Sequence, residues 1–522
     1  MSEKPSLLSA TLASGSSLVL LQIFSRGLVR LVSPQVFGTT SIQFELLLST
    51  ILFLSREGVR NALLRASSDP EKDADRSSAS PLVANIALLP ILLGIPTAVG
   101  SAFIYLGTSS SSTSSQPHFR ASVALYVFAA LSELLSEPMY IRTQNELRFH
   151  VRVRAEGAAV MLKTITTFVV LVVAPKDWSL VAFALGQTAY GLTTLVSFVV
   201  ACRENLDFRP RKVAVARETM YFDPGLFSLS MAMTGQSLIK HFLTEGDKFL
   251  VSRLSPLADQ GGYAVAANYG SLVARIVFQP IEETARVIQG AADAPTVQDK
   301  QAAETAATVL LTLLLAFTHL LLLLAAFGPP YLPLAVGLAL PRRYLSTSAP
   351  QILSVYVYYI PAMAYNGVLE ALLASAASPA DLAAHARALT LGAPLFPLAA
   401  AALARYTELG DAGLVWANVA NLALRAAYAA RFARRFFAAR GVALSWSRAV
   451  PPPPVLVAFA AAATVVRAYP HEAVAGSGVA AVWAARDHVG VGAACVLACL
   501  LTCVVRERTQ VVQLVGSLRR TR

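Results

Sequence analysis

Basic side chains occur inside segments of the chain that are otherwise apolar enough to cross a bilayer. Arg26, Arg56 and Arg425 are three of them. An isolated charge at the centre of a membrane costs roughly 2.5–3.5 kcal/mol on insertion scales, so such side chains usually face a polar cavity in which they have a function. Arginine holds phosphate oxygens through two parallel hydrogen bonds. The pattern therefore predicts a membrane protein that binds a negatively charged, phosphate-bearing ligand.

Two pairs of these arginines have a spacing of four residues, which places both members of a pair on one face of a helix. Arg26 and Arg30 form the first pair, and Arg56 and Arg60 form the second. We expect the two basic stripes to converge, because a diphosphate needs several donors at once. The candidate substrate-binding residues are Arg26, Arg56, Arg60, Lys240, Arg275 and Arg425.

Acidic residues in the same segments offer partners to these cations. Glu133 and Glu137 form an acidic stripe that could neutralise part of the cluster, whereas Glu57 points about 100° away from Arg56. The alternative interpretation is that each cation is paired with an acid and only locks helices together; we favour it for Arg286 and Lys248. The predicted supporting charge network is Glu57, Glu245, Asp247, Lys248, Glu282 and Glu283.

Composition sets the fold class. Of 522 residues, 55% are hydrophobic and 14% are charged, and the mean hydropathy is +0.56, which is too apolar for a soluble domain of this length. We predict an all-α, polytopic membrane protein with about 14 transmembrane helices. The predicted spans are 9–32, 40–63, 82–106, 121–141, 158–175, 179–202, 224–251, 262–286, 305–328, 351–376, 386–404, 411–432, 454–470 and 489–505.

The basic loop 203–222 divides six predicted spans from eight. Two six-helix bundles around a central cavity, with two further C-terminal helices, are typical of transporters. The predicted domains are an N-terminal bundle with its linker (1–222), a C-terminal bundle (223–440) and two additional helices with a basic tail (441–522). Basic residues gather on the side that holds both termini, which predicts cytoplasmic termini.

Several other functions are excluded or disfavoured. The net charge of +12 comes from basic anchors at the ends of membrane helices, which attract anionic lipid headgroups, so no nucleic-acid partner is expected. The chain has no G-x-x-x-x-G-K-[ST] loop, and its seven histidines are scattered. Asp73 and Asp75 resemble a D-x-D motif but lie in a solvated charge run. We therefore expect no enzymatic activity, no catalytic residue, no cofactor and no metal site.

Four stretches resemble a known family. They are FLSREGVRNALLRA (53–66), ELLSEPMYIRTQNELR (133–148), SLIKHFLTEGDKFLVS (237–252) and NYGSLVARIVFQPIEETAR (268–286). In sequence and order they are similar to the eukaryotic dolichol-linked oligosaccharide flippase family of the endoplasmic reticulum. That family belongs to the multidrug/oligosaccharidyl-lipid/polysaccharide export superfamily, whose members have two six-helix bundles around a V-shaped cavity.

The resemblance implies translocation of a diphosphodolichol-linked heptasaccharide from the cytoplasmic to the lumenal leaflet for N-glycosylation. It implies a multi-pass protein of the endoplasmic reticulum membrane, whose partners are the dolichol-diphosphate oligosaccharide lipid, membrane lipids and the glycosylation machinery. It carries over Arg26 in the first helix and, from the matching stretches, Arg56, Glu57 and Arg60, and the groups around Lys240, Glu245 and Arg275, with Gln279, Glu282 and Glu283.

Two other functions stay open on the sequence. One is an ion-coupled exporter of amphiphiles on the same fold, which would favour a cavity dominated by carboxylates rather than arginines. The other is a non-transporting accessory or scaffold protein of the dolichol-linked oligosaccharide pathway, in which the arginines are structural.

Overall fold

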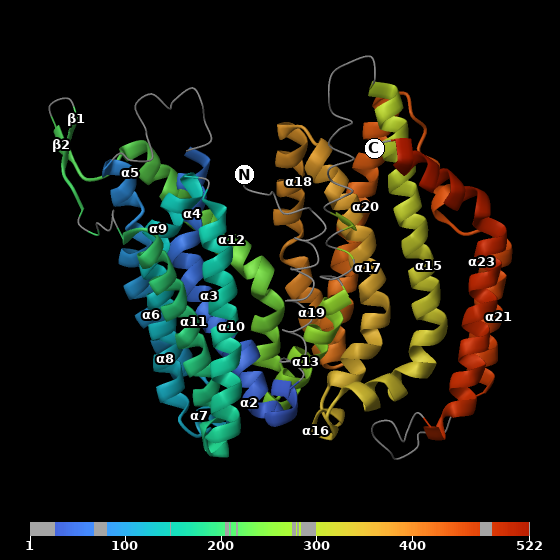
Figure 1. Cartoon of the computed structure of the whole chain (residues 1–522), viewed down its shortest axis with the longest axis horizontal. Helices are drawn as coiled ribbons and strands as arrows, with labels where there is room; N and C mark the ends of the chain where they lie inside the picture. The colour runs from blue at the N-terminus through green and yellow to red at the C-terminus, as the bar shows by residue number, and fades with distance from the viewer. Residues whose placement is uncertain are drawn as a thin grey trace, which may run out of the picture. The chain divides into compact units, whose positions relative to one another are not determined.

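The computed structural model describes residues 27–66, 81–146, 148–203, 208, 210–215, 218–273, 278, 281–282, 299–469 and 483–520. The chain forms two compact units, Met1–Gly261 and Gly262–Arg522. Each unit consists of long helices that run side by side (Figure 1). The predicted domain boundaries at 222 and 440 stay predictions.

The first unit contains helices of several kinds and one small hairpin. Its elements are α2 (Pro34–Gly38), η1 (Thr39–Phe44), α3 (Glu45–Leu52), η2 (Phe53–Glu57), α4 (Gly58–Ala66), α5 (Pro81–Ile86), α6 (Leu89–Thr108), α7 (Ser111–Ser114), α8 (Phe119–Leu135), α9 (Glu137–Asn145), α10 (Phe149–Val173), η4 (Lys176–Trp178), α11 (Ser179–Ala201), β1 (Val213–Val215), β2 (Glu218–Met220) and α12 (Pro224–Leu254).

The described residues of the second unit form helices and the turns that connect them. Helix α13 (Leu257–Val273) crosses from the first unit into the second. It is followed by α15 (Asp299–Ala339), α16 (Arg342–Leu345), α17 (Ala349–Ala376), α18 (Pro379–Gly392), α19 (Leu395–Tyr406), α20 (Asp411–Ala439), η8 (Trp446–Ala449), α21 (Pro453–Ala468) and α23 (Arg486–Arg520).

The all-α membrane fold is confirmed. Ten helices among the described residues are long and apolar enough to cross a membrane. Helices α12 and α20 lie on two further predicted spans, 224–251 and 411–432, but do not belong to these ten. The predicted span 9–32 lies largely outside the described residues, so the total of about 14 stays a prediction. Among the described residues, strands are confined to the hairpin β1–β2, in which Val213 pairs with Met220.

Helix starts follow ordinary capping chemistry. Asp223 accepts a hydrogen bond from the backbone N–H of Leu226 at 2.8 Å, just before α12 begins at Pro224. Helix α18 begins with a capping box, in which Ser378 and Asp381 each bond to the other's backbone N–H. Proline at the first helical position fits both helices, because that position needs no N–H donor.

The first described membrane span differs from a plain helix. Two π-helical segments, η1 and η2, interrupt it, and η2 contains Arg56. A π-turn adds one residue to the turn and so re-aims the side chains after it, and such turns occur often at functional sites. The predicted span 40–63 gave no sign of these interruptions, because a single extra residue leaves the mean hydropathy unchanged.

Close backbone contacts hold this span against α12. A Cβ atom added at Gly58 would overlap the backbone of Thr234. Glycine at 58, within the SREGVR stretch, therefore lets α4 and α12 approach to a distance that any side chain would prevent. This contact holds η2, which carries Arg56, and α4, which carries Arg60, against α12.

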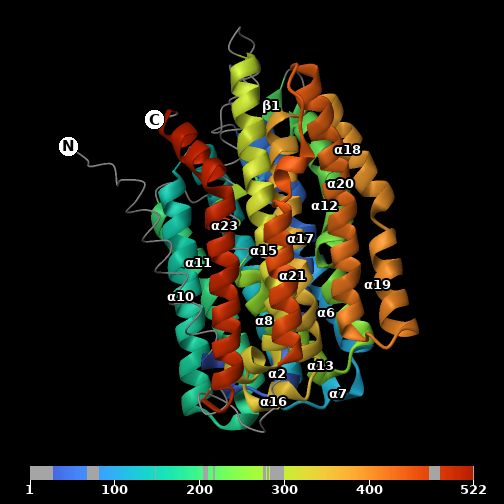
Figure 2. The same cartoon turned by 90° about the vertical axis from the view of Figure 1, so that its right-hand side faces the viewer.

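Apolar side chains fill the interior of each unit and also cover its outer surface. In the first unit, one core centres on Phe44, Tyr126 and Leu134. In the second unit, α15, α17 and α20 share a core around Phe437, and α21 and α23 pack beside α15 (Figure 2). Large apolar side chains such as Phe103, Val173 and Val505 are exposed, as lipid-facing positions require.

Candidate functional site

One part of the predicted cluster of arginines and acids is assembled in the first unit. Arg56 Nη1 lies 3.1 Å from Glu137 Oε1 and 3.5 Å from Glu133 Oε2. Arg60 Nε donates to Glu137 Oε2 at 3.1 Å, and its Nη2 donates to the other oxygen of the same carboxylate. The two arginines thus share Glu137, whose side chain is buried. The acidic stripe proposed from the sequence does neutralise this pair.

Further polar groups extend the cluster across α10 and α11. Gln187 Nε2 donates to Glu133 Oε1 at 3.0 Å, and Lys163 Nζ donates to Gln187 Oε1 at 2.6 Å. The guanidinium group of Arg60 also lies over the ring of Tyr140, 3.8 Å from its centroid, a favourable cation–π contact. Lys163 and Gln187 were not predicted from the sequence, because their spacing along the chain carries no signal for this contact.

The charges in this network nearly balance. Its ionisable groups are three cations, Arg56, Arg60 and Lys163, and two carboxylates, so the bonded network has a formal charge of +1. Near-neutrality makes the cluster tolerable within a membrane span. An anionic ligand would have to compete with Glu133 and Glu137 for the two guanidinium groups.

The other predicted site residues lie in separate places. In the second unit, Arg425 Nε and Nη2 hold both oxygens of Glu370, at 2.7 and 2.6 Å. Glu282 lies against Gly367, where a Cβ atom would overlap its carboxylate. In the first unit, Glu57 accepts a hydrogen bond from Asn61 at 3.1 Å.

Helix α12 carries the group from the TEGDK stretch. Lys248 Nζ lies 2.8 Å from Glu245 Oε2, which is the pairing expected for Lys248. Asp247 accepts a hydrogen bond from the backbone N–H of Lys248 at 2.7 Å. The side chain of Lys240 lies outside the described residues, as do Arg26, Arg275, Gln279, Glu283 and Arg286.

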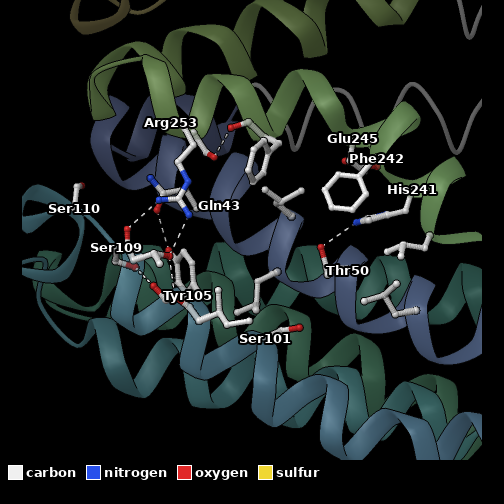
Figure 3. A pocket seen from close by; sticks show the side chains of 18 residues that line it. Gln43, Thr50, Ser101, Tyr105, Ser109, Ser110, His241, Phe242, Glu245 and Arg253 are labelled. Atoms are coloured by element: carbon white, nitrogen blue, oxygen red, sulfur yellow. Dashed lines mark hydrogen bonds between the residues drawn. The ribbon is translucent and has the colours of Figure 1, made fainter. Parts of the chain in front are cut away.

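A cavity of about 380 Å³ lies between the first described span, α6 and α12. Figure 3 shows Thr50, His241, Glu245 and Arg253 at its wall, with Thr50 Oγ1 2.9 Å from His241 Nε2. The wall is mostly apolar, with a few polar groups that converge on it, as in sites for amphiphilic ligands. Arg56 does not line this cavity, but Leu54, two residues before it, does.

Polar residues at one end of the cavity form hydrogen bonds between the surrounding helices. Gln43 donates to Gln260 Oε1 at 2.7 Å and to Thr113 Oγ1 at 3.3 Å, and it accepts a hydrogen bond from Tyr105 at 2.9 Å. Arg253 donates to the carbonyl oxygen and the hydroxyl of Thr108, at 3.2 and 3.1 Å. These bonds tie α6, α7 and α13 to η1, and α12 to α6, at this end of the cavity.

Comparison with known proteins places the chain in a family. The model of the family described as Rft protein matches residues 11–517, nearly the whole sequence. The chain belongs to the Rft protein family. This confirms the resemblance drawn from the four sequence stretches, and it extends the match through the Ala-rich C-terminal region.

Curated relatives of this Rft chain cover most of it. A Yarrowia lipolytica protein is 33% identical over 492 residues, which are 83% of this chain and 71% of the relative. A Schizosaccharomyces pombe protein is 31% identical over 442 residues, 83% of this chain and 82% of the relative. Both are named Man(5)GlcNAc(2)-PP-dolichol translocation protein RFT1.

Two solved structures share the fold. The lipid II flippase MurJ, in an inward closed conformation, matches 95% of this chain and 99% of its own with a TM-score of 0.55 and 12% identity. An inward-facing multidrug resistance MATE family transporter of the MOP superfamily matches 81% of this chain and 95% of its own, with a TM-score of 0.50 and 14% identity. The Rft chain therefore has the fold of these membrane transporters.

Proposed function

We propose that this protein moves a dolichol-diphosphate oligosaccharide from the cytoplasmic to the lumenal leaflet of the endoplasmic reticulum membrane. The observation that carries the proposal is the match over about four-fifths of the chain to relatives named for translocation of Man(5)GlcNAc(2)-PP-dolichol. The transporter fold supports it, because the helices of such a fold can enclose a polar path.

The physical problem for such a substrate is its headgroup. Each sugar hydroxyl would lose its hydrogen bonds to water in hydrocarbon, and the diphosphate would lose the hydration of its charges. A path lined by polar groups offers replacements for both, while the polyprenyl tail stays in lipid. Arg56, Arg60 and Lys163 place three cationic groups inside membrane spans of the first unit, where a diphosphate needs them.

We assign diphosphate binding to Arg26, Arg56 and Arg275, with Arg60, Lys240 and Arg425 as further contacts. Glu57, Glu245, Asp247, Lys248, Glu282 and Glu283 form the supporting charge network. Because Arg56 is held by Glu133 and Glu137, the diphosphate takes it by exchange, and Gln187, which is itself bonded to Lys163, still donates to Glu133. Because Arg56 passes directly from a carboxylate to the diphosphate and back, it is always paired with an anion. This lowers the free-energy barrier to release of the diphosphate.

The remaining parts of the proposal concern orientation and chemistry. Both termini face the cytoplasm, since the flanking basic residues gather on that side. The protein forms and breaks no covalent bond in its substrate, and partners in the glycosylation machinery supply and consume the lipid. Among the described residues, no cluster of His, Cys, Asp or Glu could hold a metal ion.

Reconstitution of the purified protein tests the function. Vesicles that contain the protein should move the dolichol-diphosphate heptasaccharide across the bilayer faster than empty vesicles, measured by access of a membrane-impermeant glycan-binding protein. Equal rates in both, together with accumulation of the dolichol-diphosphate heptasaccharide in depleted cells, would instead establish the scaffold function. Movement of small amphiphiles that depends on an ion gradient, with none of the glycolipid, would establish the exporter.

A further inference from the structure

A second polar pocket, of about 330 Å³, lies where α9 and α11 end in the first unit. It is separate from the charge cluster and from the cavity beside α12. Its lining consists of Arg142, Glu146, Arg148 and residues 200–203. Three guanidinium groups, of Arg142, Arg148 and Arg203, meet one carboxylate there, so the lining has a formal charge of +2.

Hydrogen bonds fix the positions of the charged groups. Arg142 Nε donates to Glu146 Oε1 at 2.7 Å, and Arg148 Nη1 lies 3.3 Å from the other oxygen of that carboxylate. Arg148 Nη2 also donates to the carbonyl oxygen of Ala201 at 3.4 Å, at the C-terminal end of α11. The bond from Arg142 lowers the pKa of Glu146, so the carboxyl stays ionised at neutral pH and the lining keeps its +2 charge.

The pocket continues into an apolar surface of the kind that faces lipid. Val200, which is part of its lining, is 64% exposed, and Val196, one turn earlier on α11, is 57% exposed. Both belong to the span Lys176–Ala201, which ends at the pocket. The arginines therefore lie at the level at which a membrane helix leaves the hydrocarbon, where phospholipid phosphates are found.

We propose that this pocket binds the phosphate of an anionic membrane phospholipid, with the acyl chains lying along Val196 and Val200. Planar guanidinium groups suit a phosphodiester because they donate paired hydrogen bonds to its oxygens. A free inorganic anion would use the arginines but not the valines. The lipid uses both, and its bound headgroup ties the end of α9 to the end of α11.

Lipid retention measures this directly. The full-length protein is placed in nanodiscs of phosphatidylcholine mixed with phosphatidylglycerol and then examined by native mass spectrometry for lipids that stay bound. We expect the wild type to retain phosphatidylglycerol, and the double variant Arg148→Gln with Arg203→Gln to retain at least about tenfold less, because each substitution removes charged hydrogen bonds to the bound phosphate. The matched control, Arg434→Gln with Arg435→Gln, removes two exposed arginines from α20 and should leave retention unchanged.

Cys202 lines the pocket and is only 7% exposed, so its alkylation is slow and is slowed further where a lipid covers it. In a variant with Cys495→Ala, Cys499→Ala and Cys503→Ala, alkylation of Cys202 should be slower in nanodiscs with phosphatidylglycerol than in phosphatidylcholine alone. The Arg203→Gln variant, which keeps both contacts of Glu146, should lose much of this protection even if the double variant fails to fold. Equal retention by the double variant and the wild type would overturn the proposal, as would equal protection of Cys202 by inorganic phosphate in detergent.

Discussion

Substitution of Arg56 distinguishes a role of this residue in neutralising nearby carboxylates from a role in binding the ligand. The Arg56→Ala variant loses a cation that lies 3.1 Å from Glu137 and 3.5 Å from Glu133. Breaking a buried ion pair from one side costs about 3–5 kcal/mol. The side chain of Arg56 is 24% exposed and Arg60 still holds Glu137, so we expect the lower end, about 3 kcal/mol. Thermal unfolding in detergent measures this loss.

A second substitution restores the charge. In the double variant Arg56→Ala with Glu133→Gln, the bonded network again has a formal charge of +1, as in the wild type. A glutamine at 133 can still accept the hydrogen bond from Gln187. We therefore expect the double variant to recover most of the lost stability, to within about 1 kcal/mol of the wild type.

Transport should not recover with stability. If Arg56 binds the diphosphate, the loss of its charged hydrogen bonds to the ligand should slow glycolipid movement about 10- to 100-fold in both variants. The control is Arg152→Ala, which breaks an ion pair with Glu156 at 2.8 Å whose two side chains are both more than 40% exposed; it should change stability by less than about 1 kcal/mol. Wild-type transport in the double variant would refute the reasoning, because Arg56 would then serve only to neutralise Glu133.

Three further substitutions test the packing around the site. Gly58→Ala should destabilise the protein by about 1–3 kcal/mol, because the new methyl group overlaps the backbone of Thr234. The control, Gly100→Ala, has open space around it and should be neutral or slightly stabilising in thermal unfolding. Gln43→Leu should cost about 1–3 kcal/mol, because Gln260, Tyr105 and Thr113 all lose a partner; an unchanged unfolding temperature would contradict this bonding pattern. Arg425→Ala should destabilise the second unit more than Arg405→Ala, because Arg425 makes a bidentate contact with Glu370. Equal melting curves of the two variants would show that the pair of Arg425 and Glu370 adds no stability.

The sequence predicted much of the fold, and the acidic stripe beside Arg56, for identifiable reasons. Spans such as 82–106 and 351–376 agree with α6 and α17, because a run of apolar residues long enough for the bilayer has few alternatives to a helix. Glu133 and Glu137 were named from the sequence as an acidic stripe that could neutralise part of the cluster, and both contact Arg56. For Arg56 itself the sequence favoured a role as a ligand over an ion pair. Cations and acids enclosed by hydrocarbon gain more from each other than from lipid.

Other features depend on contacts between distant segments and were not predictable. The π-turn at η2 and the link from Lys163 through Gln187 to Glu133 join segments whose spacing along the chain gives no periodic signal. The pocket at Arg142 depends on where two helices end, and helix ends are poorly defined by hydropathy. Arg26 and Arg275 lie outside the described residues, so their role as ligands stays a prediction from the sequence.

Binding of the glycolipid by the purified protein tests the central claim most directly. We expect the diphosphate-linked oligosaccharide lipid to bind the wild type, and the variant with Arg26→Ala, Arg56→Ala and Arg275→Ala to bind it at least about a hundredfold more weakly, while a lipid with the same glycan but no phosphate binds both proteins equally weakly. Equal affinity of the folded triple variant and the wild type for the diphosphate lipid would contradict the claim that these arginines recognise the diphosphate.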